Sequence, residues 1–181
     1  MKHLPTLTPV QKRFILHWGE MGPRWGVSHT VAQIYALLYL SPRPLAAEEI
    51  ADILSVARSN VSTSLRELQS WRLAVATRVL GDRRDYFETG KDVWETFRAV
   101  VEERRRREID PTLSVLRECL AQPVGGRADE YSHKRLRDLL DFLSAATSWH
   151  DEVRAVPAGT LRRLMRLGAR VQNFLSVGRS R

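Results

Sequence analysis

The stretch Glu48–Gly90 constrains the fold more than any other part of the chain. Its apolar residues recur first at helical spacing, in Glu49–Leu54 and again in Val61–Leu68, which predicts two short helices joined by a tight turn. The period then changes, and Ala74–Val79 and Asp85–Glu88 have the composition of strands around the turn GDRR. The sequence therefore predicts a helix pair followed by a two-stranded β-ribbon.

The second helix of this pair has a polar face opposite its apolar residues. Six hydrogen-bonding side chains occupy it: Arg58, Ser59, Asn60, Ser62, Thr63 and Arg66. A recognition helix in the major groove needs such residues near its N-terminal end, where arginine pairs with guanine and asparagine with adenine. Arg83 and Arg84 at the tip of the ribbon can enter a minor groove, and the flanking Asp82 and Asp85 can orient one guanidinium. We therefore predict that these eight residues contact DNA; the alternative is a solvated helix face beside a charged hairpin.

The first residue of the recognition helix is open between two choices. Its N-cap position is expected at Ala57, which has no oxygen to accept a hydrogen bond, and this costs on the order of 1 kcal/mol. Ser55 is the other candidate cap, and its use would move the start of the helix back by about two residues.

Helices are predicted for most of the remaining chain. The segments with helical spacing are 8–21, 28–40, 92–119, 133–147 and 160–175. Thr8 and Pro9 mark a helix start, Pro111 is placed to end or kink the long helix, and QPVGGRADE is expected as a loop. The fold class predicted is mainly α, a winged helix-turn-helix domain with additional dimerisation helices. Three parts are expected: the winged domain (1–90), a connecting and dimerisation helix (91–122) and a C-terminal helical segment (123–181).

Composition narrows the class of partner. Lysine and arginine outnumber aspartate and glutamate by 29 to 21, which favours a polyanion without separating DNA from RNA or an acidic membrane. Cys119 is the only cysteine, so we expect no disulfide and no cysteine zinc site, and its helical setting predicts a buried, inert thiol. The first residues lack an apolar signal region, and the apolar run 31–40 is too short for a membrane span. A cytoplasmic protein is expected.

Enzymatic chemistry finds no pattern in the sequence. The five histidines are scattered without metal-ligand spacing, MGPRWG lacks the pattern of a phosphate loop, and no Ser-His-acid set stands out. We expect no catalytic activity, no cofactor and no metal.

The layout resembles a MarR-type winged helix, and more closely its GbsR-like branch of bacterial and archaeal regulators. Three segments carry the resemblance: GVSHTVAQIYALLYLSPRPL, AAEEIADILSVARSNVSTSLRELQSWRL and VLGDRRDYFETGKDVWETF, within about residues 7–120. It implies a homodimer whose DNA-binding lobes are set on outside helices, a palindromic DNA operator, and a small-molecule effector such as a quaternary ammonium compound. Aromatic rings attract such cations, and the chain offers Trp18, Trp25, Tyr35, Tyr39 and Trp94. At helical spacing the same rings also serve as plain core.

A single winged helix covers one half-site, so a palindrome requires a dimer. The apolar stripe Trp94, Phe97, Val100 and Val101 and the C-terminal helices are the expected interface. Two other functions stay open. One is a winged helix that contacts a partner protein without specific DNA binding. The other is attachment to a membrane surface through the basic helix 160–175, with Arg162, Arg163, Arg166 and Arg170 on its polar side.

Overall fold

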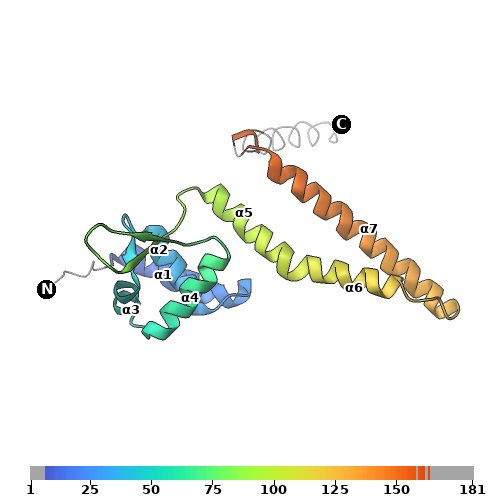
Figure 1. Ribbon diagram of the computed structural model, residues 1–181, viewed down its shortest axis with the longest axis horizontal. Helices are drawn as coiled ribbons and strands as arrows, with labels where there is room; N and C mark the ends of the chain where they lie inside the picture. The colour runs from blue at the N-terminus through green and yellow to red at the C-terminus, as the bar shows by residue number, and fades with distance from the viewer. Residues whose placement is uncertain (1–6, 158, 162, 164–181) are drawn as a thin grey trace, which may run out of the picture. The chain divides into compact units, whose positions relative to one another are not determined.

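Figure 1 shows the computed structural model of the chain, which describes residues 7–157, 159–161 and 163. The chain divides into two compact units, Met1–Glu103 and Arg104–Arg181. The first unit holds the predicted helix pair and ribbon, and the second holds a helical hairpin.

The first unit begins with two helices where the sequence predicts them. They are α1 (Pro9–Met21) and α2 (His29–Leu40), joined through a 3-10 turn (Gly22–Trp25). Thr8 caps α1 as predicted: its hydroxyl accepts the N–H of Gln11 at 3.2 Å, and the Gln11 side chain accepts the N–H of Thr8 at 2.9 Å. The hydroxyl of Ser28 accepts the N–H of Val31 at 3.1 Å and caps α2.

The predicted helix pair is α3 (Ala47–Leu54) and α4 (Arg58–Ser70). Ser55 has a φ of 54° and ends α3 in the left-handed conformation, so it is not the cap of the second helix. Ala57 is the N-cap of α4, and its carbonyl accepts the first helical hydrogen bond from Val61 at 3.1 Å. The recognition helix therefore starts at Arg58.

The ribbon is part of a three-stranded antiparallel sheet. The predicted strands are β2 (Val75–Arg78) and β3 (Asp85–Glu88), and a short strand β1 (Leu45–Ala46) joins them in the order β1-β3-β2. Tyr86 in the central strand pairs with Ala46 on one side and with Thr77 on the other. The two-stranded wing is confirmed, and β1, which the sequence did not predict, ties it to the helix pair.

One core lies between the helices of the first unit. Its fully buried large side chains are Ile34 of α2, Leu45 of β1, Ile50 of α3, and Val61, Leu65 and Leu68 of α4. Burying each such side chain contributes about 1.5–3 kcal/mol. The apolar face of α4 is thereby held in the core, and its opposite face points to solvent (Figure 1).

The long helix predicted after the ribbon is continuous but not uniform. It comprises α5 (Val93–Arg104), a π-helical segment (Arg105–Ile109) and α6 (Asp110–Leu120). Pro111 does not end it: the N–H of Asp110 bonds to the carbonyl of Arg105, five residues back, and α6 continues through the proline in its first turn.

The end of the chain differs from the prediction. α7 (Arg127–Ala155) starts inside the predicted loop QPVGGRADE and extends beyond 133–147 on both sides, and it forms an antiparallel hairpin with α6 (Figure 1). Asp129 and Glu130 lie in its first turn, where acidic side chains are favoured. Cys119 is exposed, which corrects the expectation of a buried thiol. The predicted helix 160–175 lies mostly outside the described residues. Among the described helices, none is both long and apolar enough to cross a bilayer.

Candidate nucleic-acid interface

The polar face of α4 is fully presented to solvent. Its six predicted contact residues are all exposed: Arg58, Ser59, Asn60, Ser62, Thr63 and Arg66. The buried side chains of the same helix alternate with them at helical spacing, so that core packing fixes which way the polar residues point. One guanidinium N–H of Arg66 donates to the hydroxyl of Thr63 at 3.3 Å, which places the two side chains together one turn into the helix.

The first turn of α4 has no side-chain cap. Ala57 has extended backbone dihedrals, φ −63° and ψ 140°, but its methyl group accepts no hydrogen bond. The N–H groups at the start of a helix lack partners within the helix and carry its positive dipole end. An uncapped first turn beside Arg58 is therefore suited to an anionic group such as a phosphate.

The wing tip treats its two arginines differently. Arg83 is exposed, whereas Arg84 donates from its guanidinium to Asp82 at 2.6 Å and to the hydroxyl of Tyr86 at 2.7 Å. The hydroxyl of Tyr86 donates in turn to Asp82 at 2.7 Å. The prediction that a flanking carboxylate orients one guanidinium is confirmed for Asp82 and Arg84. The other flanking acid, Asp85, lies 3.9 Å from Arg78, and both side chains are largely exposed.

The charges of this tip reinforce one another. Hydrogen bonds from Arg84, and then from Tyr86, hold the pKa of the Asp82 carboxyl far below its usual range. The Asp82 carboxylate in turn raises the pKa of the Arg84 guanidinium, and its hydrogen bond with the Tyr86 hydroxyl raises the pKa of that phenol. All three groups keep their ordinary charge states at neutral pH, and the network is intact there.

The aromatic residues predicted as an effector site lie mainly on α1 and α2. Trp18 and Trp25 meet edge to face at 4.8 Å between ring centroids, and Tyr35 and Tyr39 stack at 6.1 Å. Phe14, which the sequence prediction omitted, joins the two pairs at 4.9 Å from Trp18 and 6.4 Å from Tyr39. These rings contact one another, which is the arrangement of packed aromatic side chains. The printed ring contacts do not include Trp94.

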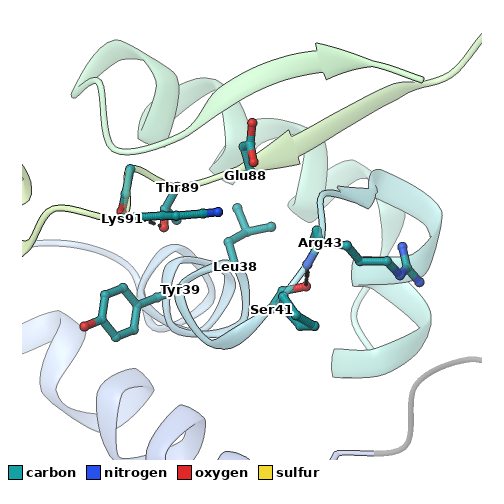
Figure 2. A pocket seen from close by; sticks show the side chains of 9 residues that line it. Leu38, Tyr39, Ser41, Arg43, Glu88, Thr89 and Lys91 are labelled. Atoms are coloured by element: carbon teal, nitrogen blue, oxygen red, sulfur yellow. Dashed lines mark hydrogen bonds between the residues drawn. The ribbon is translucent and has the colours of Figure 1, made fainter. Parts of the chain in front are cut away.

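A cavity of about 250 Å³ lies where the wing leads into α5 (Figure 2). Residues from the end of α2, the loop after it and the end of β3 line it: Leu38, Tyr39, Ser41, Pro42, Arg43, Glu88, Thr89, Gly90 and Lys91. Figure 2 shows Lys91 reaching across it above Leu38, while Arg43 is directed away. The guanidinium of Arg43 is engaged by the Glu49 carboxylate at 2.8 and 3.2 Å.

Two features of this surface lay beyond the sequence prediction. Tyr86 was not singled out, because a tyrosine in a strand is an ordinary β-former and its partner is set by the turn. Glu49 was placed in α3 without a role, yet its side chain accepts the N–H of Ala46 at 2.9 Å and fixes the start of that helix. The signal that could have found it is the carboxylate three residues after an N-cap position. In the described part of the chain, no group of three or more His, Cys, Asp or Glu side chains is arranged to hold a metal ion.

A helix pair with a solvent-facing polar recognition helix and a basic β-wing defines the class of winged helix-turn-helix DNA-binding proteins. Residues 25–85 match the sequence model of the MarR family, from the turn before α2 to the wing tip. That segment is a MarR-family winged helix, and the chain is a transcriptional regulator of this type, a class without catalytic activity of its own.

Two relatives extend the comparison over most of the chain. The chain is 22% identical over 153 residues to YvaV, a putative helix-turn-helix-type transcriptional regulator of Bacillus subtilis, covering 77% of this chain and 84% of that protein. A crystal structure of a transcriptional regulator aligns with a TM-score of 0.65 at 23% identity, over 80% of this chain and 95% of the other. The structural match supports the fold of both the winged helix and the helices after it.

Proposed function

We propose that the chain is a homodimeric repressor that binds a palindromic operator and blocks transcription by occupying it. The observation that carries the proposal is the exposed face of α4, where Arg58, Asn60 and Thr63 project from a helix whose other face is locked in the core. The printed description of the Bacillus subtilis relative as a transcriptional regulator supports the same role. Because a DNA-binding regulator works where the DNA is, we place it in the cytoplasm of a bacterial or archaeal cell.

In this proposal each winged helix reads one half-site. The first two turns of α4 meet base edges in the major groove through Arg58, Ser59, Asn60, Ser62 and Thr63, and Arg66 reaches a phosphate. The wing tip, with Arg83 and Arg84, lies over the adjacent minor groove.

Unpartnered apolar side chains support the homodimer. On α7, Leu139, Phe142 and Trp149 are 44%, 67% and 66% exposed and follow each other at helical spacings of three and seven. On α5, Phe97 is 58% exposed. Large apolar residues in one stripe mark an interaction surface, and a second copy of the chain is the partner that a palindromic operator requires. We assign residues 1–90 to DNA binding, 91–122 to the connection and dimer contacts, and 123–181 to the remaining interface.

The finer assignment is the GbsR-like branch with a small-molecule effector. The ring cluster of Trp18, Trp25, Tyr35 and Tyr39 supports an aromatic ligand environment, with Trp94 as a further candidate on α5. Ligand binding there would shift the population between dimers with different spacing of the two recognition helices. Only dimers whose spacing fits the operator would then bind it.

Titration of the protein against the DNA upstream of its own gene, at two salt concentrations, tests the proposal. Wild type is compared with Arg58→Ala/Asn60→Ala and with Arg83→Ala/Arg84→Ala. We expect tight binding at one palindromic site that the first double variant loses. The second should weaken binding and flatten its salt dependence. Weak, sequence-blind binding that neither variant changes would sink the proposal and favour a winged helix that serves as a protein-interaction module.

A further inference from the structure

We propose that the two wing arginines have separate tasks: Arg83 alone enters the minor groove, while Arg84 stays on Asp82 and Tyr86 and holds the turn that presents Arg83. Tyr86 is then a positioning residue of the DNA-binding surface. The inference rests on the proposed function for its consequence in DNA binding, but the network itself is a property of the free protein.

Every polar group of the network is engaged within the wing. The Nε–H of Arg84 donates to both oxygens of Asp82 at 3.1 Å, its Nη2 donates to Oδ2 at 2.6 Å, and its backbone N–H donates to Oδ1 at 3.0 Å. Tyr86 accepts from Arg84 and donates to Asp82, both at 2.7 Å. Charge-assisted, two-pronged bonds of this kind are the stronger class of hydrogen bond.

The anchor of the network belongs to the rigid part of the sheet. Tyr86 lies in the central strand, paired with β1 and with β2, and its side chain is 8% exposed. Its hydroxyl is therefore fixed relative to α3 and the core, while Asp82 and Arg84 belong to the turn. A functional group held on a strand and supported by hydrogen bonds is more sharply positioned than one on a free loop.

Withdrawing Arg84 from this site would be unfavourable near DNA. It would leave the Asp82 carboxylate without its cation, with two acidic side chains of α3, Glu48 and Glu49, acting on the same guanidinium. An unpaired carboxylate that faces phosphates is repelled by them. Arg83 carries no such obligation, because among the ion pairs and hydrogen bonds of the described residues it takes part in none and its side chain is exposed.

Single variants separate the two tasks. Arg83→Ala, Arg84→Ala and Tyr86→Phe are compared with wild type and with Arg24→Ala, an exposed arginine outside α4 and the wing. Binding to the upstream DNA is measured over a salt series. The exchange rate of the Arg84 backbone amide is measured in the free protein by nuclear magnetic resonance. Tyr86→Phe keeps the ring and every charge, so that its effect reports the hydroxyl alone.

We expect Arg83→Ala to lower the slope of log K against log salt by about one, as for the loss of one cationic contact. Tyr86→Phe should leave that slope unchanged, weaken binding and speed exchange of the Arg84 amide, each by about fivefold, as for the loss of one hydrogen bond. Arg24→Ala should match wild type in both measurements.

Two results would overturn the inference. One is a slope change in Arg84→Ala as large as in Arg83→Ala together with no change in Arg83→Ala alone. The other is amide exchange that Tyr86→Phe leaves at the wild-type rate. If wild type itself binds no DNA, the proposed function fails instead, while the exchange measurement still decides whether Tyr86 holds the wing.

Discussion

At the residue scale, Ala57 occupies a position where a helix normally has a hydrogen-bonding side chain. Its extended backbone already has the geometry of an N-cap, so that a serine there can accept an N–H of the first turn without rearrangement. We expect Ala57→Ser to raise the free energy of unfolding by about 1 kcal/mol, and Ser28→Ala, which removes the cap of α2, to lower it by about the same amount. Urea unfolding of the two variants measures both. A loss of stability in Ala57→Ser would show that the first turn of α4 does not accept a cap.

Glu49 makes the first unit sensitive to acid. Its hydrogen bonds with Arg43 depress its pKa, so its contribution to stability is complete above the unfolded pKa, near 4.3, and is lost as the pH falls through the lower, folded value. We expect Glu49→Gln to cost about 1 kcal/mol at pH 7 and progressively less below about pH 4.

Urea unfolding across this pH range tests the prediction for Glu49, with the exposed Glu20→Gln as control. A difference between Glu49→Gln and wild type that is the same at pH 7 and at about pH 3 would remove the ion pair as its cause.

At the scale of elements, α1 and α2 approach closely through a glycine. A Cβ added at Gly22 would lie 2.8 Å from the Cβ of Ala32 and 3.1 Å from the carbonyl oxygen of Ser28. We expect Gly22→Ala to destabilise the first unit by about 1–3 kcal/mol, because α2 has to move. Gly90→Ala, where no atom lies within 4 Å of the added Cβ, should stay within about 0.5 kcal/mol of wild type. Thermal unfolding compares them, and equal melting temperatures would contradict the close approach.

The elements also show which features the sequence can and cannot predict. α1, α2 and α4 were predictable because each has a cap position or a long apolar period of its own. The two-residue strand β1 has no period, and it exists only because β3 offers it backbone partners. The start of α7 was placed too late, since glycines suggest a loop while the acids after them belong to the first helical turn. Of the candidate site, the polar face followed from its sequence pattern, whereas the pairing of Arg84 required the turn geometry.

At the scale of the whole molecule, the apolar stripe of α7 decides whether one chain suffices. We expect Phe142→Arg to weaken self-association by about 2 kcal/mol or more, because a charge would replace a large apolar side chain at the interface. Ser148→Arg introduces the same side chain at another exposed position of α7 and should have little effect. Sedimentation equilibrium measures the dimer constant. A wild-type constant in Phe142→Arg would exclude this stripe from the interface.

The pairing of β1 with β3 has a further consequence, for the order in which the fold forms. Leu45 and Phe87 are neighbours in the sheet, yet α3, α4 and β2 all lie between them in the chain. Contacts between residues so distant in sequence form late, since the loop between them must close first. The helix pair needs only local contacts and can form earlier. A chain emerging from the ribosome therefore presents its recognition helix before it has a completed sheet to hold the wing.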